Sequence, residues 1–210
     1  MKRIVLIALV ALALPLTAFA TEVDFGNSGG TLTAGSTTLI GSSNTLSLSG
    51  SELTQVTGFN GMGLSQGMLG SVSFTTGALT SGNMMDGANF GPGGTFTIIG
   101  DGKGGLPDGV LFSGTFTGTT TWTPTGTVGV SDSIFYTLSG AISGTWYNGT
   151  KVNGATTQIT FDTGKNGFMG SVSLGSGNTV FTVTPEPGTL GLLGTGLVGL
   201  AGIVRKKNRS

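Results

Sequence analysis

The feature that most constrains the fold is an alternation of polar and apolar residues in the middle of the chain. Between residues 110 and 161, Thr and Ser alternate with Phe, Ile, Val and Trp, as in 110–117 and 156–161. Such period-two patterns are typical of strands with one face in the core and one face in water. Glycine, 41 of 210 residues, disfavours helix interiors. Since nothing between 21 and 184 has a convincing 3.6-residue apolar period, the sequence predicts an all-β body.

Turn signals separate the strand candidates of this body. They are Asp101-Gly102, Pro107-Asp108-Gly109, Asn148-Gly149 and Asn153-Gly154. An Asn-Gly pair supplies the positive φ of a type I′ hairpin turn, so we expect Trp146 and Val152 to lie on paired strands. Many short strands separated in this way predict an antiparallel β-sandwich or a barrel-like body.

The first part of the body, residues 21–51, is polar and rich in Gly, Ser and Thr. Short alternating stretches at 37–40 and 45–49 are strand candidates, and Gly29-Gly30 is turn material. The alternative is a loose leader, because a glycine-rich polar sequence buries little apolar surface.

The N-terminus has the three parts of an export signal. Lys2 and Arg3 form the positive region, and residues 4–14 are an uninterrupted apolar stretch. Ala18 and Ala20 place small residues where signal peptidase requires them, so we expect residues 1–20 to be removed and the mature chain to begin at Thr21. An uncleaved anchor is the alternative, but the apolar stretch is short for a ~30 Å hydrocarbon core.

Charge is segregated along the chain although the formal net charge is zero. Residues 21–184 contain three lysines, no arginine and eight acidic residues, a net charge of −5. A nucleic-acid groove needs clustered cations, so we expect no nucleic-acid partner.

The composition also excludes several kinds of catalytic and metal site. The chain has no His and no Cys, so it cannot build a Ser-His-Asp system, a Cys-His pair or a thiolate metal site. We therefore expect no enzyme, no cofactor and no metal. A secreted hydrolase that uses two carboxylates is a remote alternative. Its candidate residues lie in turn-like sequence: Asp86, Asp101, Asp108, Asp132 and Asp162.

Two further alternatives concern ligand binding. Residues 101–109 could clip a calcium ion, but their spacing differs from the twelve-residue calcium loop, which favours a plain hairpin loop. Trp122 and Trp146, with Tyr136 and Tyr147, could stack on sugars in a carbohydrate-binding β-sandwich module if they are exposed. Burial in the core is the more common state of such residues.

The C-terminus has a rigid polar motif, an apolar segment and a basic end, in that order. Pro185, Glu186 and Pro187 favour an extended backbone. Residues 190–204 carry no charge and would form a helix of ~22 Å, or ~25 Å with Gly188 and Thr189, which is short for the ~30 Å hydrocarbon core. The basic residues that follow stay cytoplasmic under the positive-inside rule: Arg205, Lys206, Lys207 and Arg209. A permanent tail anchor is the alternative.

Together these C-terminal features resemble the PEP-CTERM sorting signal. The resemblance covers about 25 residues and carries three features in fixed order. It implies processing by an exosortase of a Gram-negative bacterium at or near Pro185-Glu186-Pro187. It also implies transient anchoring in the inner membrane and delivery to the cell surface or extracellular matrix, often with a link to exopolysaccharide and biofilm. It adds no activity to the body.

The sequence thus predicts three parts: a signal peptide at 1–20, a β-rich body at 21–184, and a sorting signal at 185–210. Within the last part, 185–187 is the motif, 188–204 a transmembrane helix and 205–210 a basic tail. We expect an exported, non-enzymatic surface or matrix protein. Its expected partners are signal peptidase and the general secretion machinery, an exosortase, the inner membrane and exopolysaccharide.

Overall fold

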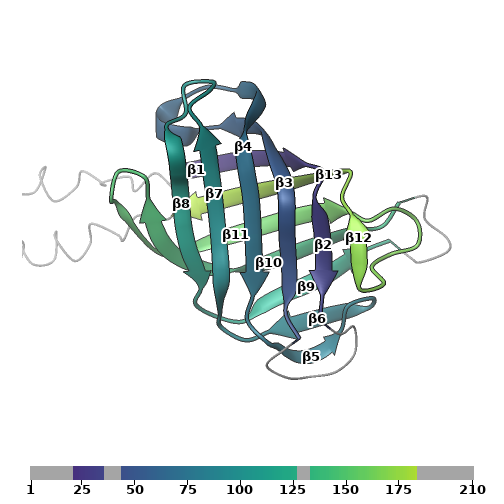
Figure 1. Ribbon diagram of the computed structural model, residues 1–210. Helices are drawn as coiled ribbons and strands as arrows, with labels where there is room; N and C mark the ends of the chain where they lie inside the picture. The colour runs from purple at the N-terminus through teal and green to yellow at the C-terminus, as the bar shows by residue number, and fades with distance from the viewer. Residues whose placement is uncertain (1–20, 36–43, 127–132, 184–210) are drawn as a thin grey trace, which may run out of the picture. The chain divides into compact units, whose positions relative to one another are not determined.

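The computed structural model describes residues 21–35, 44–126 and 133–183, and most of them lie in β-strands (Figure 1). The only helical element in these residues is a 3₁₀ turn, η1, at Phe59–Gly61. The strands are β1 Thr21–Ser28, β2 Thr31–Ala34, β3 Leu46–Thr57, β4 Ser65–Thr76, β5 Leu79–Asn83, β6 Gly87–Phe90, β7 Gly93–Asp101, β8 Asp108–Phe116, β9 Thr120–Thr125, β10 Phe135–Trp146, β11 Lys151–Asp162, β12 Ser171–Ser173 and β13 Ser176–Val183.

Eight of these strands close into an antiparallel barrel. They follow the order β11-β13-β1-β3-β4-β7-β8-β10, and β10 pairs back with β11. In Figure 1, β8, β7, β4 and β3 cross in front of β1, β13 and β11. The prediction of an all-β antiparallel body is confirmed, and the structure selects the barrel over the sandwich. The predicted signal helix and transmembrane helix lie outside the described residues.

Two strands of the barrel are shared with smaller sheets. Residues 135–139 of β10 pair with β9, while residues 142–146 pair with β8. Strand β9 continues to β6 and then β5. Residues 46–49 of β3 pair with β2, while residues 52–57 of β3 include the partners of β1. Strand β2 also pairs with β12. At one end of each shared strand, a strand outside the barrel therefore replaces one of its two barrel neighbours.

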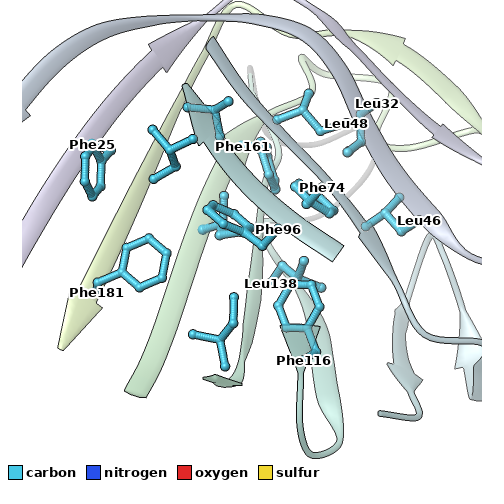
Figure 2. Packing of buried hydrophobic residues seen from close by; sticks show 14 of the residues in the cluster. Phe25, Leu32, Leu46, Leu48, Phe74, Phe96, Phe116, Leu138, Phe161 and Phe181 are labelled. Carbon is cyan, nitrogen blue, oxygen red and sulfur yellow. The ribbon is translucent and has the colours of Figure 1, made fainter. Parts of the chain in front are cut away.

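The core consists of the apolar half of each alternating strand. Phe25, Phe74, Phe96, Phe161 and Phe181 come from five different strands, and all are almost fully buried (Figure 2). The rings of Phe96 and Phe181 lie 5.3 Å apart between centroids, in an edge-to-face arrangement. Each buried aromatic side chain contributes about 1.5–3 kcal/mol through loss of contact with water. Most Thr and Ser residues that alternate with them face outward, which explains the alternation, although Thr157 and Thr179 are buried.

A second aromatic group joins β9 to β10. Trp122 stacks on Tyr136 with ring centroids 4.5 Å apart and planes at 10°. The indole Nε1 of Trp122 donates a hydrogen bond to the carbonyl of Met84 (2.9 Å), and the Tyr136 hydroxyl donates to that of Met85 (3.0 Å). That hydroxyl also accepts a bond from the backbone N–H of Phe168 (3.2 Å). The polar ends of both rings are therefore satisfied inside the protein.

The two predicted Asn-Gly turns have different outcomes. Asn148-Gly149 does join the paired strands β10 and β11, which carry Trp146 and Val152 as predicted. The turn is not type I′, however, because only Gly149 of the pair has positive φ and four residues separate the strands. Asn153-Gly154 is not a turn at all. It lies inside β11, where the register shifts opposite residues 142–144 and Gly154 takes φ +65°, so the pair forms a bulge.

The stretch 21–51 is not a loose leader where the structure describes it. Residues 21–28, 31–34 and 46–51 belong to strands β1, β2 and β3. Gly29 and Gly30 form the predicted turn with φ +64° and +84°. A side chain at Gly30 would meet the backbone of Ser51 at 2.6 Å, which explains the need for glycine. The strand candidate at 37–40 lies outside the described residues.

Candidate functional site at the paired ends of the barrel

The first and last strands of the barrel lie beside each other. Strand β1 starts at Thr21 and β13 ends at Val183, and these two residues are partners in the antiparallel register. The pairing continues without a shift to Ser28 and Ser176. The chain therefore enters and leaves the barrel at the same end, on neighbouring strands.

The predicted processing residues flank this pair in the sequence. Ala18 and Ala20 precede Thr21, and Pro185-Glu186-Pro187 follow Val183 after one residue. These residues lie outside the described part of the chain, as do Arg205, Lys206, Lys207 and Arg209. Within residues 21–35, 44–126 and 133–183, no helix is long and apolar enough to cross a membrane.

The described candidate acids of the hydrolase alternative lie in three places, and only the β7–β8 hairpin holds two of them. Asp101 and Asp108 are register partners at the end of the β7–β8 hairpin. Asp86 lies in the β5–β6 turn, where it accepts a hydrogen bond from the Asn83 amide (3.0 Å). Asp162 ends β11 and accepts bonds from the Ser133 hydroxyl and from the N–H of Gly164 (2.9 Å). Asp132 lies outside the described residues.

The loop 101–109 forms the turn of the β7–β8 hairpin, the plainer of the two expectations for it. The N–H of Leu106 donates to the carbonyl of Lys103 (3.0 Å), so part of the loop is closed by its own backbone. In the part of the chain that the structure describes, no three His, Cys, Asp or Glu residues are grouped in a way that could hold a metal ion.

The two tryptophans do not form an exposed pair for stacking on sugars. Trp122 is 1% exposed and belongs to the core, so its ring faces are not accessible. Trp146 is partly buried and packs against Phe112, with ring centroids 4.9 Å apart. It also lines a hollow of about 250 Å³ with Phe59 and Asn148. Burial of Trp122 follows from its inward position on β9, a position that the Thr-Trp-Thr alternation already indicated.

Asn60, beside that hollow, has an unusual backbone conformation. Among the described residues it is the one non-glycine residue with positive φ, +52°. Its side-chain amide donates to the hydroxyl of Tyr147 (2.7 Å), and Tyr147 is 44% exposed. The bond joins the β3–β4 connection to the β10–β11 turn.

A larger groove, of about 470 Å³, runs over the outer wall of β11, β13, β1 and β3. Its lining includes Asp24, Gln55, Thr160, Asp162 and Asn178. Of these, the sequence analysis singled out only Asp162. The others are ordinary polar residues of alternating strands, and no local pattern marks them, because residues more than 100 positions apart come together only through the barrel pairing.

The comparisons with known proteins concern the C-terminal end of the chain. A family model described as the PEP-CTERM protein-sorting motif matches residues 183–206. The chain therefore carries this sorting motif, as the resemblance of its last residues implied. No curated protein and no solved structure matches the chain.

Proposed function

We propose, from the PEP-CTERM sorting motif at residues 183–206, that the chain is an exported surface or matrix protein whose tail is removed by an exosortase. The observation that carries this proposal is the coincidence of two boundaries. The motif begins at Val183, the residue at which the last barrel strand ends. A cut at or near Pro185-Glu186-Pro187 therefore removes no strand.

The N-terminal boundary supports the same proposal. The predicted cleavage between Ala20 and Thr21 lies directly before β1, which starts at Thr21. Both processing events would then leave the eight-stranded barrel complete, with its two new ends on neighbouring strands.

The delivered barrel acts, in this proposal, as a non-enzymatic structural component of the cell surface or matrix. Support comes from the absence of His and Cys in the sequence. Among the described candidate acids, only Asp101 and Asp108 lie together, at the end of an ordinary hairpin. The biofilm role rests on the resemblance of the sorting signal alone.

The test is to follow the chain in a bacterium with an exosortase and in the same strain without it. We expect Glu186→Gln to leave the protein in the inner-membrane fraction even when exosortase is present. Glu22→Gln is the matched control, since Glu22 is an exposed glutamate of β1 beside the strand end from which the tail leaves, and it should be released like the wild type. Release of the Glu186→Gln variant at the wild-type level would contradict the proposed recognition of the motif.

A further inference from the structure

Two glycines lie in the wall of the groove on the outside of the barrel. Gly26 of β1 and Gly177 of β13 both line it. They lie on neighbouring strands, where Gly26 pairs with Asn178 and Gly177 with Asn27. A Cβ at Gly26 would lie 3.0 Å from the Cβ of Gln55, and one at Gly177 would lie 2.7 Å from the Oδ1 of Asn27, so both positions allow close approach of neighbouring side chains.

The walls of the groove are polar and carry no positive charge. The polar lining residues include Asp24, Gln55, Asn178, Thr54 and Thr160. No Lys or Arg is among the residues that line the groove. An anionic ligand would therefore meet two carboxylates, those of Asp24 and Asp162, without a compensating cation.

Two acceptor atoms beneath the surface of the groove lack hydrogen-bond donors. The Oδ1 atom of Asp24 is buried and unpartnered. Burial raises the pKa of this carboxyl, a hydrogen bond from Asn178 lowers it, and the charge of Glu22 raises it further. Asn27, which is 2% exposed, donates from its Nδ2 to Ser51 (2.6 Å) but leaves its own Oδ1 unpartnered. Buried acceptors of this kind are costly unless a donor reaches them.

An exposed aromatic ring completes the groove at one end. Phe135 is 42% exposed and lines the groove next to its register partner Asp162. An apolar ring beside carboxylate, amide and hydroxyl groups suits a ligand that has both an apolar face and many hydroxyls.

We propose that this groove binds a neutral saccharide chain, with one sugar ring on Phe135 and sugar hydroxyls hydrogen-bonded to Asp24, Gln55 and Asn178. Hydroxyl groups donate to carboxylate oxygens and both donate to and accept from amides. A neutral chain avoids the repulsion that the two carboxylates would impose on a polyuronate. The groove lies on the barrel wall and does not depend on the sorting motif, so it is tested separately from tail removal.

The experiment is affinity electrophoresis of the purified full-length chain in a zwitterionic detergent without a sugar headgroup. The gels contain dextran, galactomannan or hydroxyethyl cellulose as neutral probes, and alginate as the anionic probe. We expect at least one neutral polysaccharide to retard the protein, and alginate to do so less.

The variants locate the binding surface. Phe135→Ala and Asn178→Ala should each weaken retardation by about tenfold or more, through loss of the ring contact or of the amide hydrogen bonds. Their matched controls are Tyr147→Ala, an aromatic residue with 44% exposure at the other end of the barrel, and Asn153→Ala, an exposed residue of the β11 bulge. Both controls should run as the wild type does.

Three results would overturn the proposal. They are no retardation by any neutral probe, retardation by alginate as strong as by the neutral probes, and retardation that persists in both groove variants. A circular-dichroism melt of each variant separates loss of binding from loss of fold, because a groove variant that melts like the wild type and still binds as tightly counts directly against the site.

Discussion

The barrel requires glycine at position 94 for two separate reasons, and a matched substitution separates them. Gly94 lies on β7 opposite Thr76 and has φ +74°. A Cβ there would lie 2.0 Å from the carbonyl oxygen of Thr75 and 2.5 Å from the carbonyl carbon of Thr76. Gly29 has a similar φ of +64°, but no atom lies within 4 Å of its Cβ position.

The two alanine variants should therefore differ in stability. Both carry the backbone cost of a left-handed alanine, about 1–2 kcal/mol. Only Gly94→Ala also forces the β4 and β7 backbones apart. Such overpacking costs a further amount of about 1–3 kcal/mol. For a chain of this size the additional cost corresponds to a difference of ~2–12 °C in Tm.

The measurement is equilibrium urea unfolding followed by the fluorescence of Trp122 and Trp146, with a thermal melt as the second readout. Both tryptophans are at least partly buried in the folded barrel, so their emission should report its loss. If Gly29→Ala and Gly94→Ala lose the same stability, then the close approach of β4 and β7 does not constrain this position and the reasoning is wrong.

Three further predictions concern the aromatic group, the groove and the last strand. Tyr136→Phe removes the hydroxyl that bonds the carbonyl of Met85 and the N–H of Phe168; urea unfolding should show a loss of about 1–3 kcal/mol. The folded-state pKa of Asp24 is raised above 3.8, so Asp24 lowers stability as pH rises through the interval between its unfolded and folded pKa values. Asp24→Asn should therefore raise the Tm at pH 7 and lose this advantage below about pH 3.8, and melts at both pH values check the sign. A stop codon after Val183 should leave a barrel that melts cooperatively, whereas a stop after Gly175 removes β13 and should abolish the melt, because β1 and β11 lose their shared partner.

Local sequence pattern predicts the class of the fold but not its closure. The alternation of Thr with Phe, Ile and Trp marks the strands, because each strand has one wet face and one buried face. Nothing local shows that β10 divides its length between β9 and β8. That division depends on which distant strands meet. The Asn153-Gly154 pair misleads for the same reason: its glycine serves a bulge that only the register with β10 requires.

The two candidate sites differ in the same way. The sorting motif is linear, so its residues and their order can be found without a structure, and a family model matches them. The groove depends on Asp24 and Asn178, which are 154 positions apart and become neighbours only when β1 pairs with β13. From the sequence, the two tryptophans suggested a different binding surface. Trp122 is buried in the core instead, because its position on β9 faces inward.

The central claim is that the two proposed processing sites lie at the boundaries of the barrel. Mass spectrometry of the mature protein's two termini, in cells with and without an exosortase, tests it most directly. The account predicts an N-terminus at Thr21 in both, a C-terminus at or near Pro185-Glu186-Pro187 when exosortase is present, and an intact C-terminus at Ser210 when it is absent. Exported protein that keeps residues 188–210 in the presence of exosortase, or loses them in its absence, would contradict the account.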